Sequence, residues 1–242
     1  MHLKHFAIAA LTCFSLSAAS LQAQTLDEVL KEYYAANGAD AASKLNAVTM
    51  VGSINQSGLD IPFTMTIARP GKLRLEATFQ GLTLIQTFNG TEGWSINPFG
   101  MSTEPEPVPA DQIQDLKEQS DIDGALYNWA EKGYKVTLEG QEEIEGTNCY
   151  KLKVISPDSS ETLHFLDADS YLTIKTSTKS KMMGVEVSGE TYMSNYFQVE
   201  GVTYPGKIEN RYNGMTGEVL TISSVVQNPT VDPAIFDKPV TK

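Results

Sequence analysis

The sequence is poor in the residues from which most catalytic and metal sites are built. Among 242 residues there are 2 cysteines and 3 histidines. Beyond residue 23 only Cys149 and His164 remain. One cysteine cannot form an intramolecular disulfide, and one histidine with one cysteine makes a poor zinc site. No glycine-rich loop fits a phosphate or dinucleotide. The sequence therefore predicts no disulfide framework, no metal and no cofactor.

Basic side chains are also scarce. There are 18 Lys and Arg against 30 Asp and Glu, which gives a formal net charge of -12. Binding to a nucleic-acid backbone or to an anionic membrane surface requires clustered Lys and Arg. Beyond residue 23, no apolar run approaches the roughly 20 residues that a membrane-spanning helix needs. We therefore expect neither nucleic acid nor a membrane surface as a partner.

The first 23 residues have the layout of a secretory signal peptide. Lys4 precedes an apolar run at 6–16, small residues follow at 17–20, and residues 21–23 form a plausible cleavage site. A lipidated Cys13 is the alternative, but the usual Leu three places upstream is absent. We expect cleavage after this segment and a mature protein in the periplasm.

The rest of the chain predicts one mainly β domain over residues 24–242, of the α+β class. Thr25 can cap a helix that Asn37-Gly38 ends, and a short helical stretch follows at 39–45. Hydrophobic alternation and turn residues predict strands at 48–54, 61–68, 72–79, 82–88, 93–97, 134–138, 149–155, 161–166, 172–177, 185–197, 204–212 and 218–226. Between them, about 98–133 predicts an insert with helices at 111–118 and 122–131. We expect one twisted antiparallel sheet that curls, with helices covering one face.

Alternation in the first strands separates a dry face from a wet face. The residues assigned to the dry face are Phe63, Met65, Ile67, Leu73, Leu75, Ala77, Phe79, Leu82, Leu84, Trp94 and Ile96. Intervening positions such as Thr64 and Arg74 are mostly polar. This face is either a closed core beneath the helices or a cleft that the protein's own side chains leave partly unfilled.

Several motifs together resemble one known family. Arg69-Pro70 leads into 72–76, the run 84–99 contains an Asn-Gly, a Trp and an Asn-Pro, and Asn228-Pro229 precedes 232–236 near the end. This pattern is similar to the outer-membrane lipoprotein-sorting family, the LolA-like periplasmic carriers, in the divergent form of Bacteroidetes-type bacteria.

The resemblance implies an incomplete, strongly curved antiparallel β-barrel, a LolA/LolB-like half-barrel, with short helices as a lid. It places Leu73 and Leu75 among cavity residues. With the alternation above, the expected apolar cavity comprises Phe63, Met65, Ile67, Leu73, Leu75, Phe79, Leu84 and Trp94. Arg69 falls where carriers have a lid latch, since its five donors can bond several lid groups. A free charge at a strand end is the alternative for Arg69.

By the same resemblance, the function would be a monomeric carrier that shields the acyl chains of a lipoprotein or lipid and delivers lipoproteins toward the outer membrane. Its partners would be an inner-membrane lipoprotein-release transporter and an outer-membrane acceptor. The alternative is a lipid- or lipoprotein-sensing regulator on the same fold. We expect no enzyme, because His164 lies mid-strand without a recognisable nucleophile or orienting carboxylate.

Two acidic motifs carry weaker signals. Residues 121–124, Asp-Ile-Asp-Gly, resemble the start of a calcium-binding loop but lack its remaining ligands. Helix capping near Ser120 or Asp121 is therefore the better interpretation. Glu142 and Glu143 are adjacent on a predicted strand and therefore point to opposite sides, which favours solvated surface over paired catalytic acids.

Overall fold

The computed structural model describes residues 24–100, 102–182 and 185–240. Its helices are α1 (Leu26–Asn37), α2 (Ala39–Ala42) and α3 (Ile113–Gln119), with short 3-10 helices η1 (Pro98–Gly100), η2 (Ala110–Gln112) and η3 (Pro233–Phe236). The strands are β1 (Ala47–Gln56), β2 (Leu59–Ala68), β3 (Lys72–Phe79), β4 (Leu82–Phe88), β5 (Gly93–Ile96), β6 (Glu106–Pro107), β7 (Lys135–Ile144), β8 (Thr147–Ile155), β9 (Glu161–Asp167), β10 (Thr173–Met182), β11 (Val185–Ser194), β12 (Phe197–Val199), β13 (Val202–Tyr204), β14 (Lys207–Tyr212) and β15 (Met215–Gln227). The predicted signal peptide lies outside the described residues.

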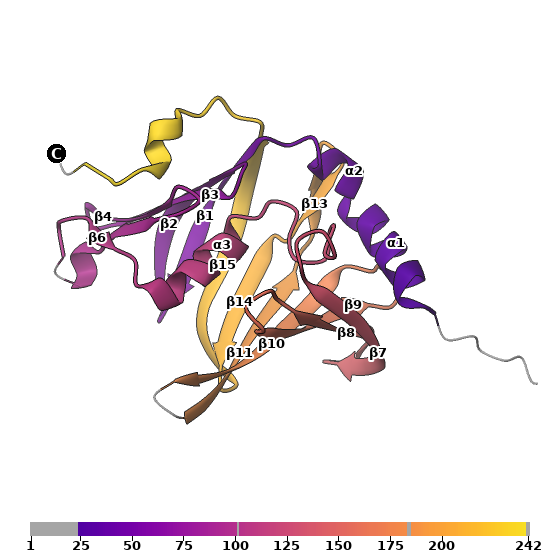
Figure 1. Cartoon of the computed structure of the whole chain (residues 1–242). Coiled ribbons are helices and arrows are strands. Elements are labelled where there is room, and N and C mark those ends of the chain that lie inside the picture. Colours follow the sequence, from indigo (N-terminus) through magenta and orange to yellow (C-terminus); the bar gives the residue numbers. More distant parts are fainter. Residues whose placement is uncertain (1–23, 101, 183–184, 241–242) are drawn as a thin grey trace, which may run out of the picture.

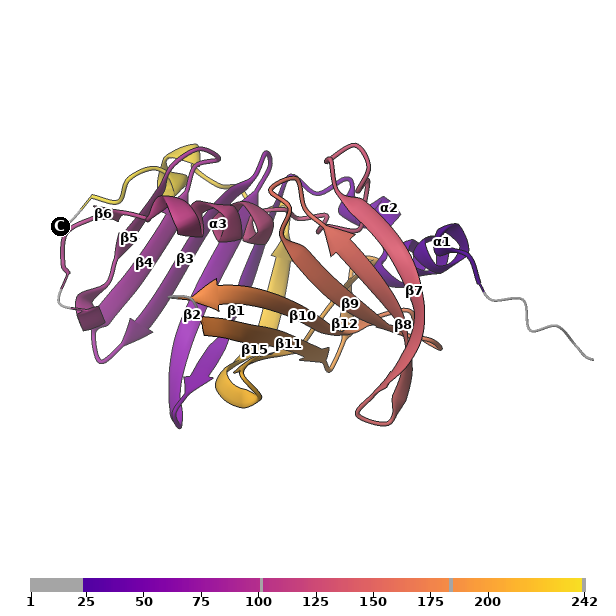
Figure 2. The same cartoon turned by 60° about the horizontal axis from the view of Figure 1, so that its bottom comes forward.

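One 13-stranded sheet organises the molecule, in the order β6-β5-β4-β3-β2-β1-β15-β14-β11-β10-β9-β8-β7. The last strand, β15, pairs antiparallel with β1 and so joins the two halves of the chain. Figures 1 and 2 show that the sheet curls without closing into a barrel. This confirms the predicted mainly β, incompletely closed architecture. None of the described helices is both long and apolar enough to span a membrane.

Helix α1 begins and ends where the sequence predicts. The Glu28 amide donates to Thr25 Oγ1 at 3.3 Å, and the Thr25 amide donates to the Glu28 carboxylate at 2.8 Å, which completes a capping box. Gly38 ends the helix in the left-handed region, with φ 70. Val29 and Leu30 are thereby directed onto the sheet, where they are buried against a cluster that includes Leu152.

Both larger helices pack on the same face of the sheet, which we call the inner face. Leu116 of α3 packs against Leu73 and Phe88 on the β3–β4 side, and α1 packs against β8 and β9. The C-terminal segment covers the opposite, outer face: Phe236 is buried beside Ala68. The predicted arrangement, with helices on one face, is therefore confirmed.

Three predicted elements differ most from the structure, and one of them is the strand at 204–212, which is divided between β13 and β14. Residues 122–131 form successive turns instead of a helix, because Gly124 and Asn128 have φ values of 68 and 50, outside the helical region. Strand β11 ends at Ser194, before the predicted 197, and Asn195 is left-handed with φ 55. Phe197 instead begins the separate β12–β13 hairpin, whose Thr203 hydroxyl donates to the Ala36 carbonyl of α1 at 2.7 Å.

Candidate functional site

Strand pairing fixes which predicted cavity residues share the inner face, because residues opposite one another in an antiparallel pair point to the same side. Met65 pairs with Leu75 and with Met50, and Phe63 pairs with Ala77. The same register places the following predicted cavity residues on the inner face: Phe63, Met65, Ile67, Leu73, Leu75, Phe79 and Leu84.

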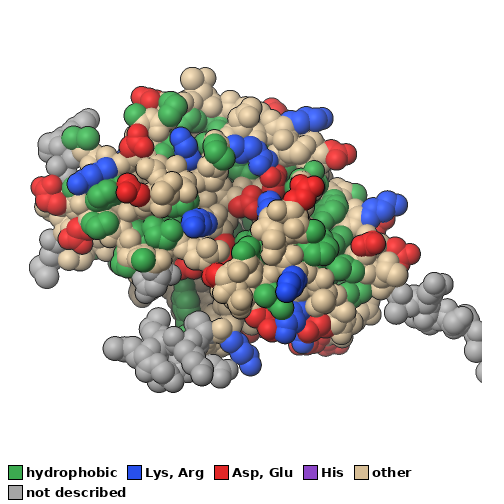
Figure 3. All heavy atoms as spheres, viewed as in Figure 1, with side chains coloured by type: hydrophobic (Ala, Val, Ile, Leu, Met, Phe, Trp, Pro, Cys, Tyr) green, Lys and Arg blue, Asp and Glu red, His purple; other side chains and the backbone are tan. Residues whose placement is uncertain are grey.

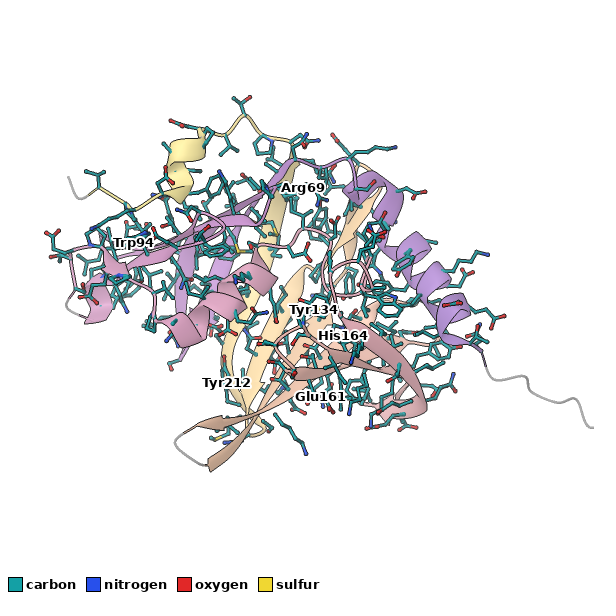
Figure 4. All side chains as sticks on the ribbon, viewed as in Figure 1. Arg69, Trp94, Tyr134, Glu161, His164 and Tyr212 are labelled. Carbon is teal, nitrogen blue, oxygen red and sulfur yellow. The ribbon has the colours of Figure 1, made fainter. Side chains whose placement is uncertain are left out.

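Trp94 is on the other side, together with Ile96, which pairs with Ile85, so the predicted place of both residues on this face is wrong. Trp94 pairs with Thr87, whereas the inner-face Phe88 pairs with Gly93. The Trp94 ring lies on the outer face, with Lys238 Nζ 4.5 Å from its centroid (Figure 4). The turn before β5 sets this register: the Asn89 side chain accepts the amides of Thr91 and Glu92.

The part of the inner face beneath α3 is sealed. Leu73 has 0% exposure, and Ile67, Phe88, Leu116 and Val108 are all buried in the same cluster. Gly93 lets α3 approach closely, since a Cβ there would lie 2.7 Å from Leu116 Cδ1. Ile67 and Leu73 are therefore core residues of the closed structure.

Beside α3, the inner face stays partly open. Met65, Leu75 and Leu84 are only half-buried, and they continue across the sheet into a cluster that contains Ile208 and Leu220. We call the following half-buried side chains the apolar strip: Met50, Ile54, Ile61, Met65, Leu75, Leu84, Ile208 and Leu220. An alkyl chain could contact this strip without displacing the sealed core.

Arg69, directly after β2, ties the insert to the rest of the fold. Its two Nη atoms donate to the two carboxylate oxygens of Asp123, each at 2.6 Å. Its Nε donates to the Leu45 carbonyl at 2.7 Å, and Nη2 also donates to the Ala42 carbonyl at 3.3 Å. The hydrogen bonds with Asp123 raise the pKa of Arg69. Arg69 is therefore a paired group that bridges α2 and the insert (Figure 4).

The sequence pattern gives no signal for the role of Asp123 in this contact. In the 121–124 motif, Asp123 binds Arg69, while Asp121 accepts from Lys132 Nζ at 2.5 Å. The two carboxylates thus hold the turns between α3 and β7 with two cations. Among the described residues, no group of three or more His, Cys, Asp or Glu is arranged to hold a metal ion.

A hollow of about 550 Å³ adjoins this contact. Its walls include Arg69, Gly71, Ser120, Ile122 and Tyr134. Hydrophobic side chains also gather where α1 meets the segment between α3 and β7 (Figure 3). The insert therefore rests on the inner face with space at its margin.

The remaining chemical candidates are structural. Cys149 is fully buried, and burial raises the pKa of its thiol. Glu142 pairs with Lys151 at 3.0 Å. Neither group adjoins the apolar strip.

His164 lies on the inner face of β9, where it pairs with Leu152 and with Thr176. The imidazole makes no hydrogen bond to another described residue. Burial lowers its pKa from 6.5 to about 4. The histidine is therefore neutral at pH 7.

The pKa of His164 predicts an acid sensitivity. The unfolded chain binds a proton near pH 6.5 and the folded chain only near pH 4, so stability should fall as the pH drops through this window. Given the partial exposure of the side chain, we expect the loss to be about 1 to 3 kcal/mol. Urea unfolding at pH 7 and pH 4.5 should show this extra loss in the wild type relative to His164→Gln. Equal losses in both proteins would contradict the assigned environment.

Comparison with known proteins supports the fold. No family model and no curated protein matches the sequence. A DUF1329 family protein from Desulfovibrio piger has a TM-score of 0.59 and 15% identity, over 86% of this chain and 97% of that one. An outer membrane lipoprotein-sorting protein domain from Vibrio parahaemolyticus has a TM-score of 0.57 and 10% identity, over 87% and 95% of the two chains.

A LolA superfamily protein from Nitrosomonas europaea has a TM-score of 0.56 and 17% identity, over 89% of this chain and 99% of that one. Each likeness covers most of both chains but at low sequence identity, so it shows the fold and leaves activity open. The resemblance inferred from the sequence motifs is confirmed at this level. The chain has the open, curved antiparallel sheet of the DUF1329 and LolA-superfamily lipoprotein-sorting proteins.

Proposed function

We propose that this protein is a periplasmic carrier that shields the acyl chains of a lipid or lipoprotein and delivers lipoproteins toward the outer membrane. The observation that carries the proposal is the apolar strip beside α3. Its side chains, such as Leu75 and Leu84, are half-buried on the inner face next to a sealed core. A binding surface of this kind needs no catalytic group.

The energetics of acyl-chain binding favour such a surface. Each methylene removed from water contributes about 0.8 kcal/mol. Even partial cover of one acyl chain therefore amounts to several kcal/mol. Met50 and Met65 lie next to one another in the strip, and methionine adapts its shape to irregular apolar partners. The strip could thus accept chains of differing length.

The Arg69–Asp123 contact would act as the latch of the insert. It combines two charge-assisted hydrogen bonds at 2.6 Å, and Arg69 remains 32% exposed. Charge-assisted bonds each contribute about 1.5–3 kcal/mol when they are shielded from water, and the exposure of Arg69 reduces the contact as a whole to about 2 kcal/mol. Partial cover of an acyl chain offsets a cost of that size, so cargo could move the margin of the insert aside and the insert could expel cargo.

The cellular role proposed here has three parts. A signal peptide at residues 1–23 would direct export to the periplasm. An inner-membrane lipoprotein-release transporter would load the carrier, and an outer-membrane acceptor would receive the cargo. The similar domain from Vibrio parahaemolyticus, described as lipoprotein-sorting, supports this assignment by fold.

The first test concerns occupancy and the apolar strip. Mature protein should be isolated from envelope extract and its organic phase analysed by mass spectrometry, where we expect acylated molecules. In a fluorescent fatty-acyl displacement assay, Leu75→Glu should weaken binding about 10-fold or more, because it places a carboxylate in the strip.

Thr78→Glu is the matched control, because Thr78 is exposed on the outer face of the same strand. It should bind the probe as the wild type does. Circular dichroism should confirm that both variants fold. If no acylated molecule is recovered and the purified protein binds no acyl probe, the carrier proposal is wrong.

A further inference from the structure

The inner face also carries a row of polar side chains that crosses five neighbouring strands. His164 on β9 pairs with Thr176 on β10, and Thr176 pairs with Thr191 on β11. Thr191 pairs with Asn210 on β14, which in turn pairs with Glu218 on β15. We call these five residues the polar row. Strands β10 and β11 lie side by side in the foreground of Figure 2.

The polar row runs directly beside the apolar strip. Ile208 pairs with Met193 and with Leu220, and Leu220 pairs with Ile54. Asn210 and Glu218 each lie two residues from a member of this apolar line, and residues two apart on a strand share a face about 7 Å apart. If the acyl chain of a ligand lies on the strip, the polar atoms at the end of that chain would therefore reach the polar row.

The members of the row have hydrogen-bonding capacity to spare. Thr191 Oγ1 donates to Asn210 Oδ1 at 2.8 Å, and Asn210 Nδ2 donates to Glu218 Oε1 at 2.9 Å. His164 and Thr176 make no side-chain hydrogen bond to another described residue, although both are half-buried. A half-buried polar group without a protein partner is best satisfied by water or by a ligand.

The charges of these strands indicate which ligand chemistry fits. Cations on these strands and on the neighbouring β8 point to the outer face, where Lys153 of β8 pairs with Glu161, Lys175 Nζ lies 5.6 Å from the Phe165 ring centroid, and Arg211 stacks over Tyr192. On the inner side, the row offers neutral hydroxyl, amide and imidazole groups, and Glu218 adds a negative charge. Among the described residues of these five strands, no Lys or Arg faces the inner side, so a phosphate there would meet the Glu218 carboxylate without a compensating cation, which is unfavourable.

We propose that the polar row binds the uncharged ester or amide linkage of an acylated ligand whose chains occupy the apolar strip. This inference rests on the proposed carrier function and names the class of its cargo. Hydroxyl, amide and imidazole donors suit ester and amide carbonyls. The ligand class is therefore acylglycerol- or N-acyl-linked, as in a lipid-modified peptide, and anionic phospholipid headgroups are disfavoured.

The test compares ligands that differ only at the linkage. Displacement of the fluorescent acyl probe should be measured with a diester-linked diacylglyceryl lipopeptide, its diether analogue and phosphatidylglycerol. In the wild type we expect the diester lipopeptide to bind about 3- to 30-fold more tightly than the diether, which lacks the carbonyls. Phosphatidylglycerol also carries two ester-linked acyl chains, and we expect it to displace the probe less effectively than the diester lipopeptide does.

The double variant Thr176→Val/Thr191→Val keeps side-chain shape and removes both hydroxyls. It should lose most of the preference for the diester while it binds the diether as the wild type does. Ser177→Ala, on the outer face of β10, is the matched control and should keep the preference.

Equal affinity for diester and diether in the wild type would overturn the linkage site, and so would a preference that survives in the double variant. Tighter binding of phosphatidylglycerol than of the lipopeptide would overturn the assigned ligand class. In each of these cases acyl binding itself persists, so the carrier proposal survives. Failure of all three ligands to displace the probe would overturn this inference, and failure of the probe to bind would overturn the proposed function as well.

Discussion

Leu73→Ala is expected to lower the free energy of unfolding by about 2 to 5 kcal/mol, the range for a fully buried leucine whose removal leaves a cavity. Leu73 is 0% exposed, and it packs against Phe88 and Leu116 beneath α3. Urea unfolding monitored by tryptophan fluorescence should report the change. Because the core beneath α3 is sealed, acyl-probe affinity of the folded variant should change little.

Leu75→Ala is the matched comparison, because it removes the same atoms two residues along the same strand and face. Leu75 is half-buried in the apolar strip, so its truncation should cost less than about 2 kcal/mol of stability and should weaken acyl binding more than Leu73→Ala does. Similar stability losses for the two variants would contradict the division of the inner face into a sealed core and an open strip.

The contrast between Leu73 and Leu75 marks what alternation in the sequence could predict. Period-2 patterning assigned both residues correctly to one face, since their polar neighbours face the other way. It could not indicate which of them α3 would cover. That depends on where Leu116 and Val108 come to rest, and these side chains belong to an insert whose path is set by tertiary contacts.

Register and bulges account for the other misassignments. Alternation assigns Trp94 to the wrong face, because the turn at Asn89 sets the pairing of β5. In the second half, register shifts in β10 near Thr173 and in the β14–β15 pair near Asn210 break the simple alternation. The polar row therefore became evident only once the strand pairs were known.

The role of Asp123 is not predictable from the sequence for a different reason. Its motif indicates a local capped turn, whereas its partner Arg69 lies 54 residues earlier in the chain. The family resemblance indicates only Arg69 and gives no sign of its partner. A long-range pair of one acid and one base has no periodic signature, so a single sequence does not reveal it.

Arg69→Leu is expected to loosen the insert without unfolding the sheet. Arg69 and Asp123 are 32% and 11% exposed, between the surface pairs that contribute about 0–1 kcal/mol and the buried pairs whose disruption costs about 3–5 kcal/mol. We expect Arg69→Leu to reduce the free energy that favours the closed position of the insert by about 2 kcal/mol. Amide hydrogen exchange at Ser120, Asp121 and Gly124, which donate within the insert, should become about 10- to 100-fold faster.

Arg69→Lys separates charge from geometry. A lysine keeps the positive charge but has no planar fork to bond both Asp123 oxygens and the Leu45 carbonyl together, so it should recover only part of the protection. Lys153→Gln removes a cation that pairs with Glu161 on the outer face, and it should leave exchange in the insert unchanged.

A double-mutant cycle with Asp123→Asn then decides whether the pair acts as a latch. If it does, the two single variants and the double variant should loosen the insert by similar amounts, because either change already breaks the contact. All three should also speed release of a bound lipopeptide to acceptor vesicles, since less free energy opposes opening. Additive effects on exchange, or release kinetics unchanged from the wild type, would mean that Arg69 anchors α2 to the sheet and does not control access to the inner face.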